Sequence, residues 1–292
     1  MPFFTGTSSV FDAFRYLPAI PALALGTVLF LWLLHRFRLS RLDPKPPSLA
    51  DGSLRKLTIG ALGALALAAL CVLAPALVGS YRESPDWSAF AYPATTAAPG
   101  NAARLLAIFL LQSLSEELLF RGVVMGALGV LFLFVLAFVT VHPLPGEPDG
   151  SGRLAAARHR TWLLAGLLAN AVQAGLFTMV HGANPGVTLI ASINIGLAGF
   201  VLGWLYWSQG SLLGAWAWHF VWNFSLAAAG LPVSGVLAAP ALLPLGISGA
   251  RPGLLSGGSF GPEASLLCTA GLLAFLGVLL RVSRRPESTD RT

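Results

Sequence analysis

The sequence predicts an all-α membrane protein, a polytopic helix bundle with about eight transmembrane helices. Of the 292 residues, 55% are hydrophobic and only 10% are charged, and the mean hydropathy is +0.75. A soluble domain carries about 25% charged residues. Several apolar runs approach the roughly 20 residues that a helix needs to cross a bilayer. These runs are continuous rather than alternating, so they do not indicate a membrane β-barrel.

The chain is expected to form one integral membrane domain, 1–292, because no stretch between the apolar runs is long enough for a large soluble domain. The formal net charge of +6 comes largely from short loops. That distribution is typical of the positive-inside effect and does not indicate a nucleic-acid partner. Cys71 and Cys268 lie inside apolar runs, where cysteine packs as a small core residue, so no disulfide is expected.

The apolar runs set the expected spans. The first is followed by a strong basic cluster and lacks a basic leader, which indicates an uncleaved span with the cluster in the cytoplasm. The stretch 102–141 would be about 60 Å long as one helix, twice the apolar thickness of a bilayer, so we divide it near Arg121–Gly122. The expected spans are about 17–34, 57–79, the two halves of 102–141, 161–180, 187–207, 212–229 and 264–282.

The loop charges disagree about the side of the C-terminus. Eight full crossings return it to the side of the N-terminus, outside the cytoplasm. Arg281, Arg284 and Arg285 instead favour a cytoplasmic C-terminus. Either one apolar run is not a full crossing or the charge rule fails here. The segment 231–261, rich in Pro and Gly, is expected to lie in the interface or to re-enter the membrane.

Two adjacent carboxylates and an arginine interrupt the apolar run at 105–122. A charge near the bilayer centre costs roughly 2.5–3.5 kcal/mol, so such groups usually face a bundle interior or a wet cavity and mark function. Residues four apart share a helix face, so Glu117 and Arg121 are expected to pair. Glu116 points elsewhere and is left free. The alternative is that all three side chains merely hold helices together.

Two histidines lie in or beside spans among apolar neighbours. His181 ends one span, four residues after Phe177. His219 and Asn223 are also four apart and therefore project from one face of a later span. Together with Glu116, these positions offer a carboxylate, two imidazoles and an amide.

This set allows two kinds of chemistry. Glu116, His181 and His219 could bind zinc as two histidines and one carboxylate with an open position. Alternatively, Glu116 could take a proton from water without a metal while an imidazole and an amide stabilise the oxyanion. The chain contains neither HExxH nor GxSxG, so nothing indicates a soluble metalloprotease or a serine hydrolase.

Three motifs in order resemble the CPBP family, the CAAX-protease and bacteriocin-processing group of intramembrane proteases, also called Abi proteins. They are E-E-x-x-x-R at 116–121, F-x-x-x-H at 177–181 and H-x-x-x-N at 219–223. The resemblance covers about 102–231, the expected protease core, with an active site enclosed by the central helices. The segment 126–160 is longer than is usual in the family.

The resemblance implies an endopeptidase that cleaves a membrane protein or a lipid-anchored peptide, such as a prenylated CAAX-type C-terminus, a leader peptide or a sorting tail. By the same resemblance, the residues that activate water are Glu116 and His181, those of the oxyanion site are His219 and Asn223, and the supporting residues are Glu117, Arg121 and Phe177.

The family has been described both as metalloproteases and as metal-free glutamate proteases. We expect no cofactor, because Asn223 beside His219 suits oxyanion binding better than ligation, and zinc is the alternative. The expected location is a bacterial inner membrane, crossed several times. The competing hypothesis is a non-catalytic membrane protein, either an immunity or assembly factor or a transporter. The intact motifs and the lack of internal repeats disfavour it.

Overall fold

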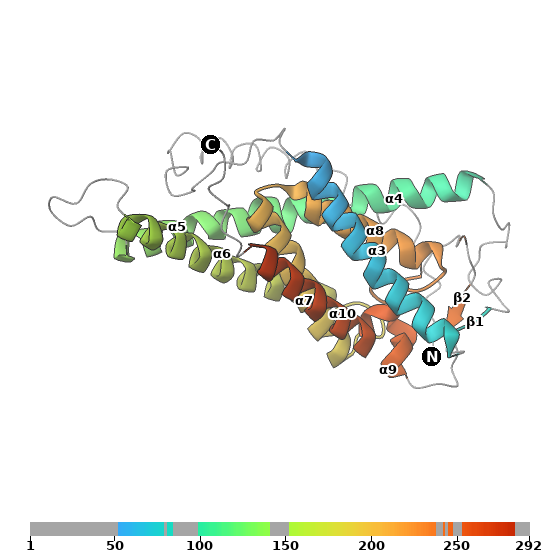
Figure 1. Cartoon of the computed structure of the whole chain (residues 1–292). Helices are drawn as coiled ribbons and strands as arrows, with labels where there is room; N and C mark the ends of the chain where they lie inside the picture. The colour runs from blue at the N-terminus through green and yellow to red at the C-terminus, as the bar shows by residue number, and fades with distance from the viewer. Residues whose placement is uncertain are drawn as a thin grey trace, which may run out of the picture.

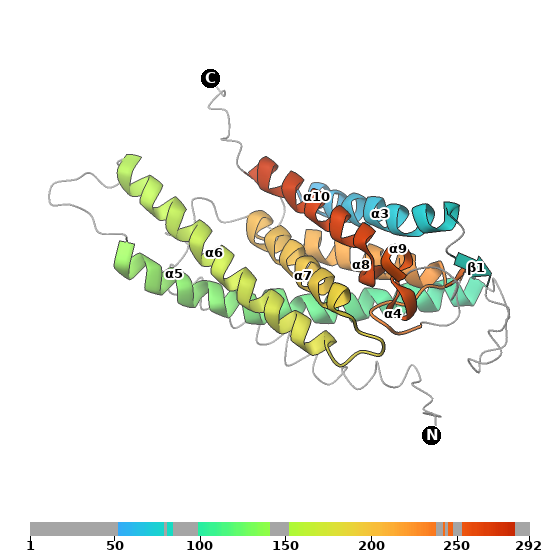
Figure 2. The same ribbon diagram turned by 90° about the horizontal axis from the view of Figure 1, so that it is seen from below.

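The computed structural model describes residues 52–78, 81–83, 99–140, 152–237, 242, 245–247 and 253–283. This part of the chain is almost entirely helical, as predicted (Figures 1 and 2). The expected first span, 17–34, lies outside the described residues.

Four helices are long and apolar enough to cross a membrane, judged by length and composition. They are α3 (Ser53–Leu77), the run Ala102–Val139, the part Ala156–His181 of α6 (Gly152–His181), and α7 (Leu189–Gln209). α8 (Leu212–Ala228) is 17 residues long, and α10 (Leu266–Ser283) contributes a shorter apolar stretch. The helices occur where spans were expected, but eight full spans are not found among the described residues.

Residues 99–140 form one continuous helix, which corrects the predicted division of 102–141 at Arg121–Gly122. α4 (Pro99–Glu117) passes into a π-helical segment, η3 (Leu118–Met125), and then directly into α5 (Gly126–Thr140). A glycine inside a helix costs only about 1 kcal/mol, so Gly122 does not end it. The change in local geometry is absorbed by the π segment, a rare form that is frequent at functional sites.

α5 and α6 lie side by side and extend together beyond the other helices (Figure 2). The apolar run Ala102–Val139 has 38 residues, or about 57 Å of helix. It is therefore much longer than the roughly 30 Å apolar thickness of a bilayer. Phe134 and Phe138 are exposed on its outer face, as expected for side chains in contact with lipid.

α8 is the central helix, in contact with α3, α4 and α7. It approaches α3 so closely that a Cβ added at Gly60 would lie 2.0 Å from the carbonyl oxygen of Gly214. Small residues that allow backbones to touch are typical of helix interfaces in membranes. Trp218 and Trp222 stack on α8, with ring centroids 5.8 Å apart, and belong to the main core cluster. α8 is thereby fixed where it presents His219 and Asn223.

The described part of the C-terminal segment, 231–264, packs against α7 and against the turn that follows α6. That 231–261 lies in the interface or re-enters the membrane stays a prediction. The C-terminal segment contains the bridge Val233–Val236, α9 (Gly253–Ser256), η4 (Gly258–Phe260) and η5 (Pro262–Ala264). A short ribbon, which the sequence did not predict, pairs β1 (Tyr81–Glu83) antiparallel with β2 (Leu245–Ile247). The amide of Asn184, after α6, donates to the carbonyl of Ser234 at 2.8 Å. These contacts bring the C-terminal segment to the site described next.

Candidate active site

Glu117 is fully buried and joins Arg121 to His219 through a single carboxylate oxygen. Arg121 Nη1 donates to Glu117 Oε1 at 2.9 Å, which confirms the pair expected from the spacing. His219 Nδ1 lies 2.7 Å from the same oxygen. Because a carboxylate only accepts hydrogen bonds, we assign a proton to Nδ1 of His219. Glu117 is therefore the partner of Arg121 and also orients His219.

The π-helical segment places Arg121 in the interior, where its side chain is completely buried. Nη2 donates to the carbonyl of Gly199 at 3.1 Å, and the guanidinium carbon lies 4.7 Å from the centroid of the Phe177 ring. Gln173 of α6 donates to the same carbonyl of α7 at 2.8 Å. Arg121 thus binds η3 to both α6 and α7, and this fixes the relative positions of the motif residues.

Glu116 points away from Arg121, as expected. Its Oε1 accepts a hydrogen bond from Gln112 Nε2. Its Oε2 is buried, has no hydrogen-bond partner, and lies 3.7 Å from His219 Nε2. That distance is too long for a direct hydrogen bond. Glu116 therefore presents an unused oxygen beside the free nitrogen of His219.

Gln112 is a member of the site that the motif analysis missed. It lies one turn before Glu116 and donates to it, while its own oxygen accepts from Asn223 Nδ2 at 3.0 Å. The i, i+4 spacing to Glu116 is the sequence signal that could have found it. An amide nitrogen carries two hydrogens, so Asn223 keeps a second N–H beyond this bond.

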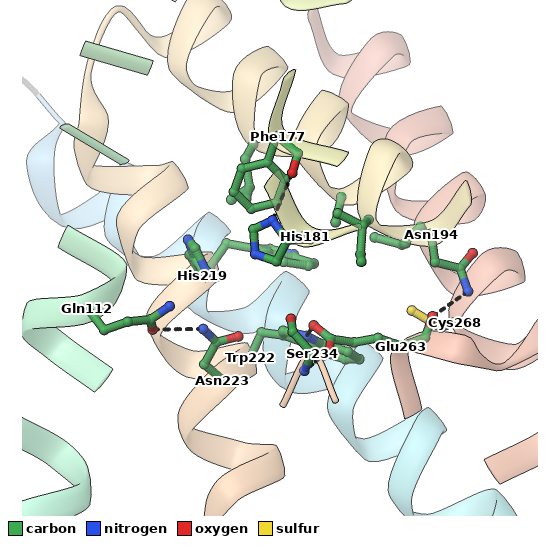
Figure 3. Close-up of a pocket in the computed structure, with 15 residues that line it drawn as sticks. Gln112, Phe177, His181, Asn194, His219, Trp222, Asn223, Ser234, Glu263 and Cys268 are labelled. Carbon is green, nitrogen blue, oxygen red and sulfur yellow. Dashed lines mark hydrogen bonds between the residues drawn. The ribbon is translucent and has the colours of Figure 1, made fainter. Parts of the chain in front are cut away.

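His181 lies at the end of α6 and faces the same space as His219 and Asn223 (Figure 3). Its Nδ1 is 2.8 Å from the carbonyl oxygen of Phe177. A carbonyl only accepts, so Nδ1 donates, and Nε2 carries the lone pair of the neutral ring. Phe177 separates the two imidazoles, with ring centroids 4.4 Å from His181 and 6.2 Å from His219.

These side chains surround a cavity of about 30 Å³, enough for roughly one or two water molecules. Its walls combine polar groups with apolar residues of α7, α8 and α10. Glu116 and Glu117 do not line it directly, and they reach it through Gln112 and His219. The polar residues that line the cavity are Gln112, His181, Asn194, His219, Asn223, Ser234 and Glu263.

The alternative zinc site of the sequence analysis is Glu116, His181 and His219. In the described part of the chain, no three His, Cys, Asp or Glu side chains come together in an arrangement that could hold a metal ion. Nδ1 of His181 is bonded to the Phe177 carbonyl and Nδ1 of His219 to Glu117, so each ring keeps Nε2 free, as zinc-bound histidines also do. The choice between a metal-free site and a zinc site stays a prediction.

Cys71 and Cys268 are buried and form no disulfide, as the sequence predicted. Cys268 contributes to the apolar wall of the cavity. The other additions to the site are Ser234 and Glu263, which come from the C-terminal segment. No motif pointed to them, because they lie outside the stretch in which the three motifs occur.

A family model described as "Type II CAAX prenyl endopeptidase Rce1-like" matches residues 98–225. We call residues 98–225 the Rce1-like segment, after the family model that they match. This match contains all three motifs and confirms the resemblance seen in the sequence. Comparisons with curated proteins and with solved structures gave no match.

The Rce1-like segment and the four long apolar helices together indicate an integral membrane protein. The segment begins in α4 and ends within α8, so it includes Gln112 as well as the motif residues. Ser234 and Glu263 fall outside it.

Proposed function

We propose that the protein is an intramembrane endopeptidase that cleaves a peptide bond with a water molecule activated by Glu116 and His181. The observation that carries the proposal is the position of His219 between two carboxylates. Its Nδ1 lies 2.7 Å from Glu117 Oε1, and its Nε2 lies 3.7 Å from Glu116 Oε2. His181 and His219 line the water-sized cavity, and the two carboxylates lie directly behind Gln112 and His219. Carboxylates and imidazoles held this close to a water site are what hydrolysis by general acid–base catalysis requires.

Glu116 is the general base in this proposal. Gln112 holds one of its oxygens, while the other is buried and unpaired, so it can accept a proton from water. His181 Nε2 carries a lone pair and accepts a second hydrogen bond from the same water. The protonated Glu116 then gives its proton to the leaving amine when the peptide bond breaks.

Asn223 and His219 stabilise the oxyanion that forms when water attacks the carbonyl carbon. Asn223 supplies the N–H that Gln112 does not use. His219 can donate from Nε2 only as an imidazolium, because the proton on Nδ1 is directed to Glu117. The carboxylate of Glu117 stabilises that positive charge by Coulomb attraction, also after Glu116 has taken the proton from water. Fixed donors of this kind act only weakly in the ground state and strongly in the transition state.

The substrate is a membrane protein or a lipid-anchored peptide, which reaches the site from the bilayer of a bacterial inner membrane. Support for this comes from the apolar outer faces of the helices and from the apolar walls of the cavity. A peptide anchored in the membrane would be concentrated next to those walls.

Terminal peptidomics of membranes tests the proposal whatever the identity of the substrate. New N- and C-termini are compared between membranes with the full-length protein and membranes without it. We expect a small set of paired termini, at or near membrane-anchored segments, only where the protein is present. The same termini in both samples would count against proteolysis and favour a non-catalytic role.

A further inference from the structure

Glu263 lines the cavity directly, unlike Glu116 and Glu117, and the mechanism proposed above does not use it. Glu263 belongs to η5, which lies beyond the Rce1-like segment, and it is only 9% exposed. Figure 3 shows it next to Ser234 and Trp222, across the cavity from His181. An ionisable side chain inside a membrane protein needs a partner, and that partner often indicates its function.

The bonding of Glu263 leaves its negative charge uncompensated. Its Oε1 accepts from the indole N–H of Trp222 at 3.0 Å, and its Oε2 accepts from the backbone N–H of Ser234. Both donors are neutral, and two N–H donors suit a carboxylate that only accepts. Within the described part of the chain, Glu263 forms no ion pair. Each oxygen has a second lone pair, so the group can accept further hydrogen bonds.

The backbone beneath Glu263 is fixed in place. The side-chain amide of Asn194 donates to the carbonyls of Glu263 and Ser265, both at 2.8 Å. Thr269 in turn donates to the oxygen of Asn194 at 2.7 Å, which holds that amide in its orientation. The carboxylate is therefore held at the cavity wall rather than turned away from it.

We propose that Glu263 is a subsite for a cationic group of the substrate, a lysine or arginine side chain near the cleaved bond. This inference rests on the proposed endopeptidase function. The cavity of about 30 Å³ has room for the charged end of such a side chain beside Glu263, next to the apolar wall residues Ile195, Ala198 and Leu202. The same carboxylate repels an anionic group, including the free carboxylate at a peptide C-terminus.

The test uses the full-length protein in nanodiscs and a peptide built on a cleavage site found by terminal peptidomics. The peptide is made with lysine, norleucine or glutamate at each position flanking the cleaved bond in turn. At one position we expect kcat/KM for lysine to exceed that for norleucine by roughly tenfold or more, with glutamate cleaved least. In Glu263→Gln the preference for lysine over norleucine should fall to within about twofold, mainly through KM.

A matched variant separates recognition of charge from a purely structural role. Trp222→Phe removes one donor to Glu263 but keeps the carboxylate, so it should keep the lysine preference even where total activity falls. If Glu263 only holds the C-terminal segment in place, both variants should lose activity equally on all peptides and unfold at lower temperature, which overturns the inference.

Two further outcomes are distinguishable. Cleavage by the wild-type protein without a lysine preference at any position overturns the cationic subsite and leaves the proposed function standing. Failure to cleave any peptide defeats the proposed function, and the subsite inference falls with it.

Discussion

Two side chains in this site each form hydrogen bonds with two other residues. One oxygen of Glu117 binds both Arg121 and His219, and Gln112 joins Glu116 to Asn223. Residues in one hydrogen-bond network do not contribute independently. Replacement of a connecting residue is therefore expected to disturb groups on both sides of it.

Gln112→Leu tests the connection between the base and the oxyanion donor. Leucine is similar in size but removes both hydrogen bonds, so Glu116 and Asn223 lose their common support. We expect kcat to fall on the order of 10- to 100-fold, because small displacements of reacting groups are costly, while KM changes little. Steady-state kinetics check this, with Leu111→Ala on the exposed face of the same helix as the control. Wild-type kcat in Gln112→Leu would contradict the role.

Asn223 can distinguish an oxyanion site from a metal site. Asn223→Ala should lower kcat by about 10²–10³, the usual cost of losing one oxyanion donor, with little change in KM. Asn223→Asp should be at least as damaging, since it places a negative charge toward the developing oxyanion. Comparison of kcat for the two variants under the same conditions distinguishes the oxyanion site from the metal site. An aspartate variant clearly more active than the alanine variant would indicate ligation, because a carboxylate is a competent metal ligand.

At the scale of single residues, the sequence could predict contacts between residues that are four apart on one helix. The Glu117–Arg121 pair follows from a separation of four residues. The contact between Glu117 and His219 spans 102 positions and depends on how α8 packs, so spacing does not reveal it. Glu263 was missed for the same reason, since the C-terminal segment reaches the cavity only through tertiary folding.

At the scale of elements, the contact between α3 and α8 sets the position of His219 and Asn223. α8 can lie against α3 only because Gly60 and Gly214 allow the backbones to meet. The helices themselves were predictable from their apolar runs. The continuity of α4, η3 and α5 was not, because a π segment has no clear sequence pattern and a single glycine is a weak helix breaker.

Gly60→Ala should loosen this contact. Its Cβ would lie 2.0 Å from a backbone oxygen, so α3 and α8 must move apart. We expect a loss of about 1–3 kcal/mol in stability, the usual cost of overpacking, together with lower activity. Thermal unfolding in nanodiscs measures the loss. Gly175→Ala is the matched control, because nothing lies within 4 Å of its Cβ, and it should be neutral or slightly stabilising. Equal unfolding temperatures for the two variants would contradict the packing argument.

At the scale of the whole molecule, the continuous helix suggests how the conflict between loop charges and crossings is resolved. If the helix 99–140 crosses once, we expect seven crossings instead of eight, provided that the first apolar run also crosses. The segment 142–160 and the C-terminus would then both lie in the cytoplasm. That places the arginines of both regions on the side that the positive-inside effect favours.

Cysteine labelling tests this topology. Single cysteines are introduced as Ser88→Cys, Ser151→Cys and Ser288→Cys, and intact cells receive a membrane-impermeant maleimide. Ser88→Cys should be labelled in intact cells, whereas the other two should be labelled only after permeabilisation. The wild-type protein is the blank, because its two cysteines are buried. Labelling of Ser151→Cys in intact cells would mean that the long helix does not cross once.

The most direct test of the central claim, that Glu116 activates the water, is the activity of purified Glu116→Gln. Glutamine keeps the shape of the side chain but cannot take a proton. On a peptide that the wild-type protein cleaves in nanodiscs, we expect cleavage to fall by about 10²–10⁴ while thermal unfolding is unchanged. Leu111→Ala, on the exposed face of the same helix, should cleave normally. Cleavage by Glu116→Gln at the wild-type rate would contradict the account.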